Sequence, residues 1–365
     1  MVYLPALRRG VAEWLKALAW KVCLWETVTR VRIPLPPPVP VSVRYELSPI
    51  FRIAHRSSWD YAPVQPNRSS EPLLVSYTPL LIPSQVSVVT ILTPQRNIVV
   101  FGFDSAWTDN PRKPGALCSV AFDERGESVF AEPRLVNFDG AREAITATRC
   151  GYPLSIVAID QPTIVPNLTG SRPVDKVAAS LVSYVGGGVQ PANRSKIGMF
   201  CDKAPIWSFL HKLGAAQFPL DARTASAGHF IMEVFPALAL PSLDPRFAGR
   251  NCAPKYNPAN WSKFCLHDWR AVTDLVGQTA ERVGVKGISD WAVGMGKLAR
   301  PKKADQDKLD SVLCALIGLL WRSDFPEASA MFGDFERGYM ITPVSSDTRL
   351  RLECAAAKHS VSRSA

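Results

Sequence analysis

Two aspartates directly follow apolar stretches that are typical of buried strands. Asp104 comes after Val-Val-Phe-Gly-Phe, and Asp160 comes after Ile-Val-Ala-Ile. A carboxylate at the end of an apolar strand is costly unless a cation, a helix N-terminus or hydrogen bonds compensate its charge. One such aspartate is commonly a turn or cap residue. Two of them, at strand ends where α/β sheets place ligands, indicate a shared binding site.

A third acidic element precedes a long apolar stretch that is typical of a buried helix. Asp307 and Asp310 are three residues apart in the segment 305–310, so they share one helix face. N-terminal capping and the helix dipole explain the first acids of this segment. They explain Asp310 less well, because it lies beside the apolar stripe. Capping and metal ligation both remain open for these acids.

The acids Asp104, Asp160, Asp307 and Asp310 could together hold two divalent cations about 4 Å apart. In such a site one metal lowers the pKa of an attacking water and the other stabilises the leaving oxygen. Hard oxygen ligands favour Mg²⁺ or Mn²⁺ over zinc, so we expect one of these ions as cofactor.

The elements that must position these acids follow from apolar patterning and turn residues. We expect strands over residues 97–104, 115–123, 128–136, 154–160 and 229–235. We expect helices over 139–150, with Asp139 as N-cap, and over 305–321. Residues 161–228 and 244–303 are too long for simple connections and predict helical insertions near the active face, including 173–185, 204–213 and 261–283. This order predicts an α/β fold, a mixed β-sheet flanked by helices.

The first ~95 residues differ from the rest and are expected to be irregular. Residues 1–97 hold 13 of the 31 prolines. Residues 10–23 and 30–38 resemble a serine transfer-RNA gene read as protein, although a genuine leader or linker is the alternative. We therefore expect residues 1–96 to be a non-native or disordered leader, with a true start in 80–97, so that deleting residues 1–90 leaves the melting temperature nearly unchanged. A domain over 97–345 and a frayed polar tail over 346–365 complete the prediction.

Charge and composition exclude little. The net charge is +10, but residues 1–97 carry +6 of it and the remainder only +4, so basicity is weak evidence for nucleic acid. The eight cysteines form no Cys-x-x-Cys pair, which argues against a zinc knuckle and favours reduced thiols in a cytoplasmic protein. We expect no membrane association, because the apolar segment 311–321 is too short to cross a bilayer.

Several short segments in a fixed order resemble a known family. They are GFDSAW (102–107), AIDQP (158–162), SRPVD (171–175), GVQPANR (188–194), EVFPA (233–237), KYNP (255–258), DKLD (307–310) and residues 333–343. Together they resemble domain of unknown function 429, a predicted ribonuclease-H-like nuclease group. The resemblance implies a ribonuclease-H-like fold. It also implies that Asp104, Asp307 and Asp310 are metal ligands, with Asp160 as the acid of the fourth strand. Glu233 lies in a family segment and is either a further ligand or a structural acid bonded to neighbouring backbone.

Five more residues are candidates for substrate binding. Trp107 could stack a base or line the core, Asn193, Arg194 and Lys196 could present polar groups to phosphate, and Arg172 could instead pair with Asp175 at a helix start. The leading hypothesis is a metal-dependent nuclease whose catalytic residues are Asp104, Asp160 and Asp310 and whose partner is nucleic acid. The alternatives are an actin/sugar-kinase-like phosphotransferase and a non-catalytic ribonuclease-H-like binding module.

Overall fold

A computed structural model describes residues 95–322 and 326–364. These residues belong to one compact unit, Pro83–Ala365. The predicted leader, residues 1–96, lies outside them except for its last two residues. Across the described ranges, no helix combines the length and apolar character needed to cross a bilayer.

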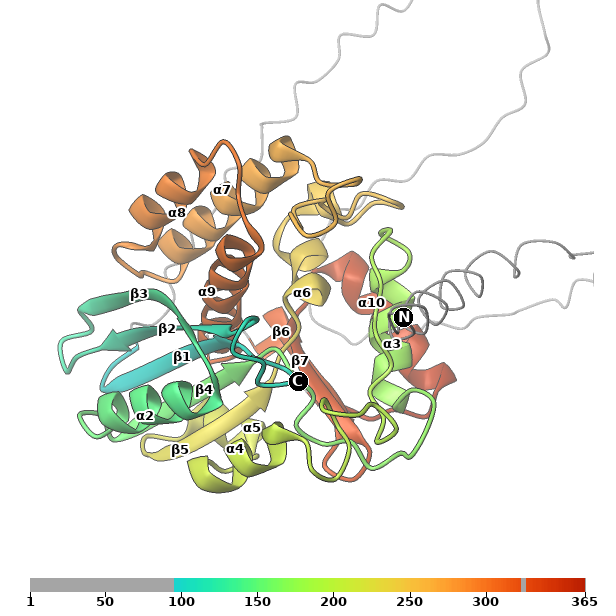
Figure 1. The fold of residues 1–365 in the computed structure, drawn as a ribbon, viewed down its shortest axis with the longest axis horizontal. Helices are drawn as coiled ribbons and strands as arrows, with labels where there is room; N and C mark the ends of the chain where they lie inside the picture. Colours follow the sequence, from blue (N-terminus) through green and yellow to red (C-terminus); the bar gives the residue numbers. More distant parts are fainter. Residues whose placement is uncertain (1–94, 323–325, 365) are drawn as a thin grey trace, which may run out of the picture. The chain divides into compact units, whose positions relative to one another are not determined.

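A five-stranded mixed sheet forms the centre of the unit (Figure 1). Its strands are β1 (Ile98–Asp104), β2 (Gly115–Phe122), β3 (Ser128–Val136), β4 (Leu154–Ile159) and β5 (Gly228–Glu233), in the order β3-β2-β1-β4-β5. β2 is antiparallel to β1 and β3, whereas β1, β4 and β5 run parallel. This mixed order confirms the predicted ribonuclease-H-like sheet. All five expected strands are present, with bounds within two residues of those predicted.

Helices cover both faces of this sheet. The helices of the described residues are α2 (Phe138–Arg149), α3 (Pro173–Val182), α4 (Pro205–Leu213), α5 (Pro219–Thr224), α6 (Pro236–Leu243), α7 (Leu266–Arg282), α8 (Ile288–Gly296), α9 (Lys303–Trp321) and α10 (Ser346–Lys358), with 3₁₀ turns at Pro245–Phe247 and Pro326–Ala328. Successive strand residues point to opposite faces. Val99, Phe101 and Phe103 of β1 therefore pack with α2 and α4, whereas Ile98 and Val100 pack with α7, α8 and α9. Figure 1 shows these two helical layers on opposite sides of the sheet.

A second, three-stranded sheet lies beyond β5. It has the order β7-β6-β8, formed by Gly338–Pro343, Ser329–Asp334 and Arg363–Ser364. A parallel bridge between Val234 and Ile341 joins β7 to the chain just after β5. The turn between β6 and β7 falls within the family segment 333–343, for which no element was predicted.

Two local predictions are wrong. The N-cap of α2 is Asn137, whose side chain accepts a hydrogen bond from the Gly140 amide, and Asp139 lies in the first turn instead. Residues 346–365 are no frayed tail, because most of this stretch forms α10, which buries Leu352 and Ala356 against the cluster that contains α3. The predicted helices over 173–185 and 261–283 are present but shorter, as α3 and α7.

Candidate functional site

Asp104 and Asp160 lie side by side at the carboxyl ends of two parallel strands. β1 and β4 pair in parallel with Phe103 opposite Ile159. The pairing continues by one more hydrogen bond, because the Asp160 amide donates to the Phe103 carbonyl at 2.9 Å. Neighbouring strands are about 4.8 Å apart, so the two aspartates start from adjacent backbone positions. The structure thus brings together the two strand-end acids that the sequence singled out.

Helix α9 brings Asp310 to the same place. Asp104 is on the face of β1 that carries Ile98 and Val100, which is the face that α9 covers. Gly102 lies on this face as well, and its missing side chain lets α9 approach unusually closely. A β-carbon on Gly102 would lie 1.9 Å from the carbonyl oxygen of Ser311. Since Ser311 follows Asp310, this contact fixes the height of Asp310 above the ends of the strands.

Asp310 is buried and held by two side chains. Its Oδ1 accepts a hydrogen bond from the Tyr256 hydroxyl at 2.8 Å, and its Oδ2 accepts one from the Gln306 amide at 3.0 Å. Only 6% of Asp310 is exposed. Sequence reasoning missed the role of Tyr256, although this residue lies in the KYNP segment, because 54 residues separate it from Asp310.

Burial and neighbouring charges shift the pKa values of the three acids. Burial raises the pKa of Asp104 well above its usual value, and the negative charges of Asp160 and Asp310 raise it further. Burial likewise raises the pKa of Asp160, and the charge of Asp310 adds to this shift. Burial raises the pKa of Asp310 to about 6. The cluster therefore concentrates negative charge at a place where water compensates it poorly.

Lys303 and Asp307 form the rim of this cluster. They lie on the first turns of α9 and form an i,i+4 ion pair. Burial alone would lower the pKa of Lys303, but the charges of Asp104, Asp310 and Asp307 raise it, so Lys303 remains a cation. Asp305, by contrast, caps α9 by accepting a hydrogen bond from the Lys302 amide at 2.8 Å. The acids of this segment thus divide between capping, the rim and the cluster itself.

Glu233 belongs to a separate buried ion cluster. Arg172, which is 0% exposed, donates to both of its oxygens, at 2.6 and 2.9 Å, and the Thr163 amide donates to Oε2 at 3.1 Å. Arg172 also pairs with Asp175 at 2.8 Å, which confirms the predicted i,i+3 ion pair. These contacts favour the structural alternative for Glu233. They also remove Arg172 from the accessible surface, so its direct contact with a substrate is not supported.

The other substrate-binding candidates divide between structure and surface. Asn193 is buried, and its amide donates to the Gly170 carbonyl at 2.6 Å, so it stabilises its own loop. Arg194 lies 4.8 Å from the ring centre of Trp207 and forms an ion pair with Asp202 at 3.2 Å. Lys196 is half-buried. None of these three side chains lines the pocket that adjoins the acids.

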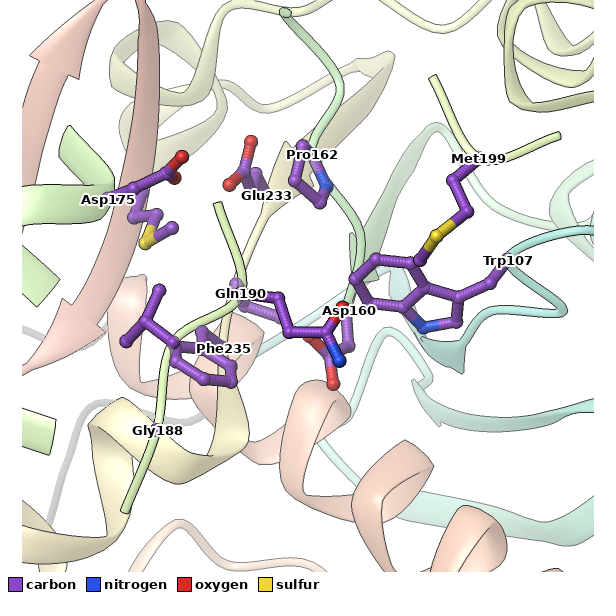
Figure 2. Close-up of a pocket in the computed structure, with 12 residues that line it drawn as sticks. Trp107, Asp160, Pro162, Asp175, Gly188, Gln190, Met199, Glu233 and Phe235 are labelled. Atoms are coloured by element: carbon purple, nitrogen blue, oxygen red, sulfur yellow. The ribbon is translucent and has the colours of Figure 1, made fainter. Parts of the chain in front are cut away.

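Trp107 does line that pocket, together with Asp160 (Figure 2). Its ring packs edge-on against Phe200, with the ring centres 5.8 Å apart. Trp107 is only partly buried and has a positive φ of 45°. Trp107 therefore packs in a small apolar cluster and also leaves part of its surface accessible beside the acids. The two predicted roles, lining the core and stacking a base, are compatible.

Asp104, Asp160 and Asp310 are the residues that could hold a divalent cation, because their oxygens suit hard ions and their burial separates them from water. In the side-chain positions described for residues 95–322 and 326–364, no three His, Cys, Asp or Glu groups are gathered tightly enough to ligate one ion. Like charges repel, and the carboxyl groups would have to turn toward one another to share a cation.

The fold and the acids define a ribonuclease-H-like α/β domain with a carboxylate cluster at the ends of β1 and β4. Residues 102–334 match the family described as "Protein of unknown function (DUF429)", and the chain belongs to this family. No curated protein and no solved structure matches the chain.

Proposed function

We propose that the domain is a metal-dependent nuclease, which hydrolyses phosphodiester bonds in nucleic acid. One observation carries the proposal: Asp104 and Asp160 are in-register neighbours on parallel strands, with Asp310 brought against them by α9. A buried cluster of three acids lowers the stability of the fold, so its presence indicates a function that needs the charge. Binding of divalent cations is such a function.

Asp104, Asp160 and Asp310 would hold the cation, with Asp307 at the rim. When bound, Mg²⁺ or Mn²⁺ supplies a water of lowered pKa and stabilises negative charge on the leaving oxygen. Tyr256 and Gln306 orient the carboxylate of Asp310 through their hydrogen bonds. Groups that orient a ligand in this way commonly change metal affinity when they are removed.

A basic segment that leads into α9 supports a polyanionic substrate. Residues 297–303, KLARPKK, lead directly into α9 and contain Lys297, Arg300, Lys302 and Lys303. All four side chains reach solvent, and Lys303 also forms the ion pair with Asp307. Clustered lysine and arginine attract phosphate backbones and release the counterions that surround them. This segment would therefore position a phosphate chain at the entrance to the acidic cluster.

The test is a cleavage assay on purified protein with single- and double-stranded DNA and RNA, in EDTA, Mg²⁺ or Mn²⁺. ATP is included as a competing substrate because a phosphotransferase would hydrolyse it. We expect cleavage of nucleic acid only with metal, and a loss of about 100-fold or more in Asp160→Asn. Asp290→Asn, which changes an exposed acid on α8, is the control. Equal cleavage by Asp160→Asn and wild type would contradict the proposal, as would the absence of metal-dependent cleavage on all substrates.

A further inference from the structure

A pocket of about 210 Å³ adjoins the carboxylate cluster. Its wall is shared with the cluster through Asp160, and the remaining lining comes from chain segments that are distant in sequence. The lining residues are Trp107, Asp160, Pro162, Asp175, Gly188, Val189, Gln190, Met199, Glu233, Val234, Phe235 and Met340. This volume is smaller than the roughly 300–1,000 Å³ of pockets for drug-sized ligands. The pocket therefore has room for one small ring system.

The side walls of the pocket are aromatic and apolar. In Figure 2, Trp107 and Phe235 stand on opposite sides of the view, with Asp160 and Gln190 between them. The contact with Phe200 fixes the Trp107 ring, and Met199 lies beside it. Flat aromatic walls bind flat aromatic ligands, because stacking buries both faces without a strict requirement for one sequence or substituent.

Most polar atoms of the lining are already engaged. Asp175 accepts hydrogen bonds from Arg172 and from the Ala192 amide at 3.0 Å, and Glu233 is held by Arg172 on both oxygens. Gln190 differs from these acids. Its side chain is exposed and makes no hydrogen bond to any residue in the described part of the chain. An amide can both donate and accept, so Gln190 can pair with the edge of a heterocycle.

We propose that this pocket receives a single unpaired nucleobase of the nucleic acid that the domain cleaves. The base lies against Trp107, its edge pairs with the Gln190 amide, and its sugar-phosphate extends past Asp160 to the carboxylates. This inference rests on the proposed function for the identity of the substrate. It goes further in naming the form of the substrate, which is a single-stranded segment, a frayed end or a flipped nucleotide.

A pocket for an unpaired base predicts a preference for single-stranded substrates. A base that is paired and stacked in a duplex cannot enter this partly open pocket without leaving the stack, and this extrusion costs a few kcal/mol. Single strands do not have this cost. The domain therefore cleaves single-stranded substrates in preference to intact duplexes, and free nucleosides bind at the same place.

Binding of free nucleosides without metal tests the pocket separately from catalysis. Adenosine, cytidine and their 2′-deoxy forms are titrated into the full-length protein in EDTA by calorimetry. We expect measurable binding that Trp107→Leu and Gln190→Ala each weaken about 10-fold or more, as for a lost base stack. Trp261→Leu and Gln278→Ala, which change an exposed tryptophan in the loop before α7 and an exposed glutamine on α7, are the matched controls. Gln190 is exposed, so its variant folds even if Trp107→Leu does not.

A cleavage assay on matched single-stranded and duplex oligonucleotides completes the test. Nucleoside binding that depends on Gln190, in a protein that cleaves nothing, would support the pocket and overturn the nuclease proposal. Cleavage that is equal on both substrates and unchanged in Gln190→Ala would leave the nuclease proposal standing and overturn the pocket. Ribose and deoxyribose oligonucleotides of one sequence, compared in the same assay, distinguish RNA from DNA as the source of the base.

Discussion

Gly102 of β1 faces the backbone of Ser311 in α9 so closely that no side chain fits between them. A β-carbon on Gly102 would lie 1.9 Å from the Ser311 carbonyl oxygen and 2.5 Å from the Ala315 amide nitrogen. Both residues are adjacent to the acids of the site, since Asp104 and Asp310 lie two and one residues away. The close approach of the helix and the geometry of the carboxylate cluster therefore depend on one glycine.

We predict that Gly102→Ala lowers the free energy of unfolding by about 3 kcal/mol or more, because the added methyl group forces α9 away from the sheet. Urea denaturation measures this change. Gly294→Ala is the matched control, since a β-carbon at Gly294 of α8 meets no atom within 4 Å. That variant is expected to be neutral or slightly more stable because alanine favours helix. Equal stability of Gly102→Ala and wild type would mean that α9 does not rest on β1 as described.

Arg172 is predicted to matter for stability without regard to metal or substrate. It is fully buried, and its removal in Arg172→Met leaves Glu233 and Asp175 as unpaired buried charges. We expect a loss of about 3–5 kcal/mol, in EDTA and in Mg²⁺ alike. Arg172→Lys should rescue little, because lysine cannot bind two carboxylates through paired hydrogen bonds.

The control for Arg172 is Arg337→Met, which breaks an exposed ion pair with Asp334 of the same i,i+3 spacing. Exposed pairs contribute about 0–1 kcal/mol, so this variant should melt close to wild type. A small effect of Arg172→Met in the same denaturation series would show that the buried ion cluster of Arg172, Glu233 and Asp175 contributes little to stability.

The sequence was sufficient for the central sheet because β1, β2 and β4 are largely apolar runs bounded by turn or acidic residues, whereas the mostly exposed β3 followed from the hairpin turn before it. The Asp123–Gly126 turn and the aspartates after β1 and β4 mark such ends. Helix α10 was missed for the opposite reason. Its buried residues are Thr348, Leu352, Ala355 and Ala356, and a face with only one large apolar side chain gives a weak apolar pattern.

For the site, local patterns identified the acids but not their partners. Asp104, Asp160 and Asp310 stand out because each is a charge beside an apolar run. Tyr256 does not stand out, because its hydrogen bond to Asp310 crosses 54 positions of the chain. The pairing of Arg172 with Glu233 crosses 61 positions and is hidden in the same way. Such contacts follow from the topology of the fold and have no local periodicity.

Tyr256→Phe is predicted to weaken Mg²⁺ binding by about 10-fold or more, because Asp310 loses the hydrogen bond that orients its carboxylate. Titration calorimetry with Mg²⁺ alone measures the affinity. Tyr339→Phe is the control: Tyr339 is also buried, and its hydroxyl donates to the Ile231 carbonyl at 3.4 Å. Equal affinities for Tyr256→Phe and wild type would argue that Asp310 is not a ligand.

Stability is predicted to depend on pH through Asp310. Its pKa is about 6 in the folded protein, whereas the ordinary value of an aspartate is 3.8. Between these pH values the folded state therefore binds more protons than the unfolded state. The contribution of Asp310 to stability therefore falls as the pH rises from about 4 to 6. Burial lowers the pKa of His229 to about 4, which acts in the opposite direction over the same window. The comparison is therefore between wild type and Asp310→Asn, in which His229 is unchanged.

In EDTA, we expect the free energy of unfolding of wild type, relative to Asp310→Asn, to fall by an amount on the order of 1–3 kcal/mol between pH 4 and pH 6. Denaturant unfolding at intervals of half a pH unit measures this difference. A difference that is constant with pH, or that grows in favour of wild type, would show that burial does not raise the pKa of Asp310.

Asp104→Asn separates a metal ligand from a structural aspartate. Burial and the charges of Asp160 and Asp310 disfavour the ionised Asp104 side chain when no cation is present. Asparagine keeps the shape and removes the charge, so in EDTA we expect the variant to melt at the same temperature as wild type or higher. In Mg²⁺ the order reverses, because wild type gains the binding free energy of the ion and the variant gains little of it. A cap or turn aspartate would instead lose about 1 kcal/mol under both conditions. Paired melting curves with and without Mg²⁺ distinguish these outcomes, with Asp290→Asn as control. Equal destabilisation of Asp104→Asn in both buffers would show that Asp104 is structural. The nuclease proposal would then lose its principal residue.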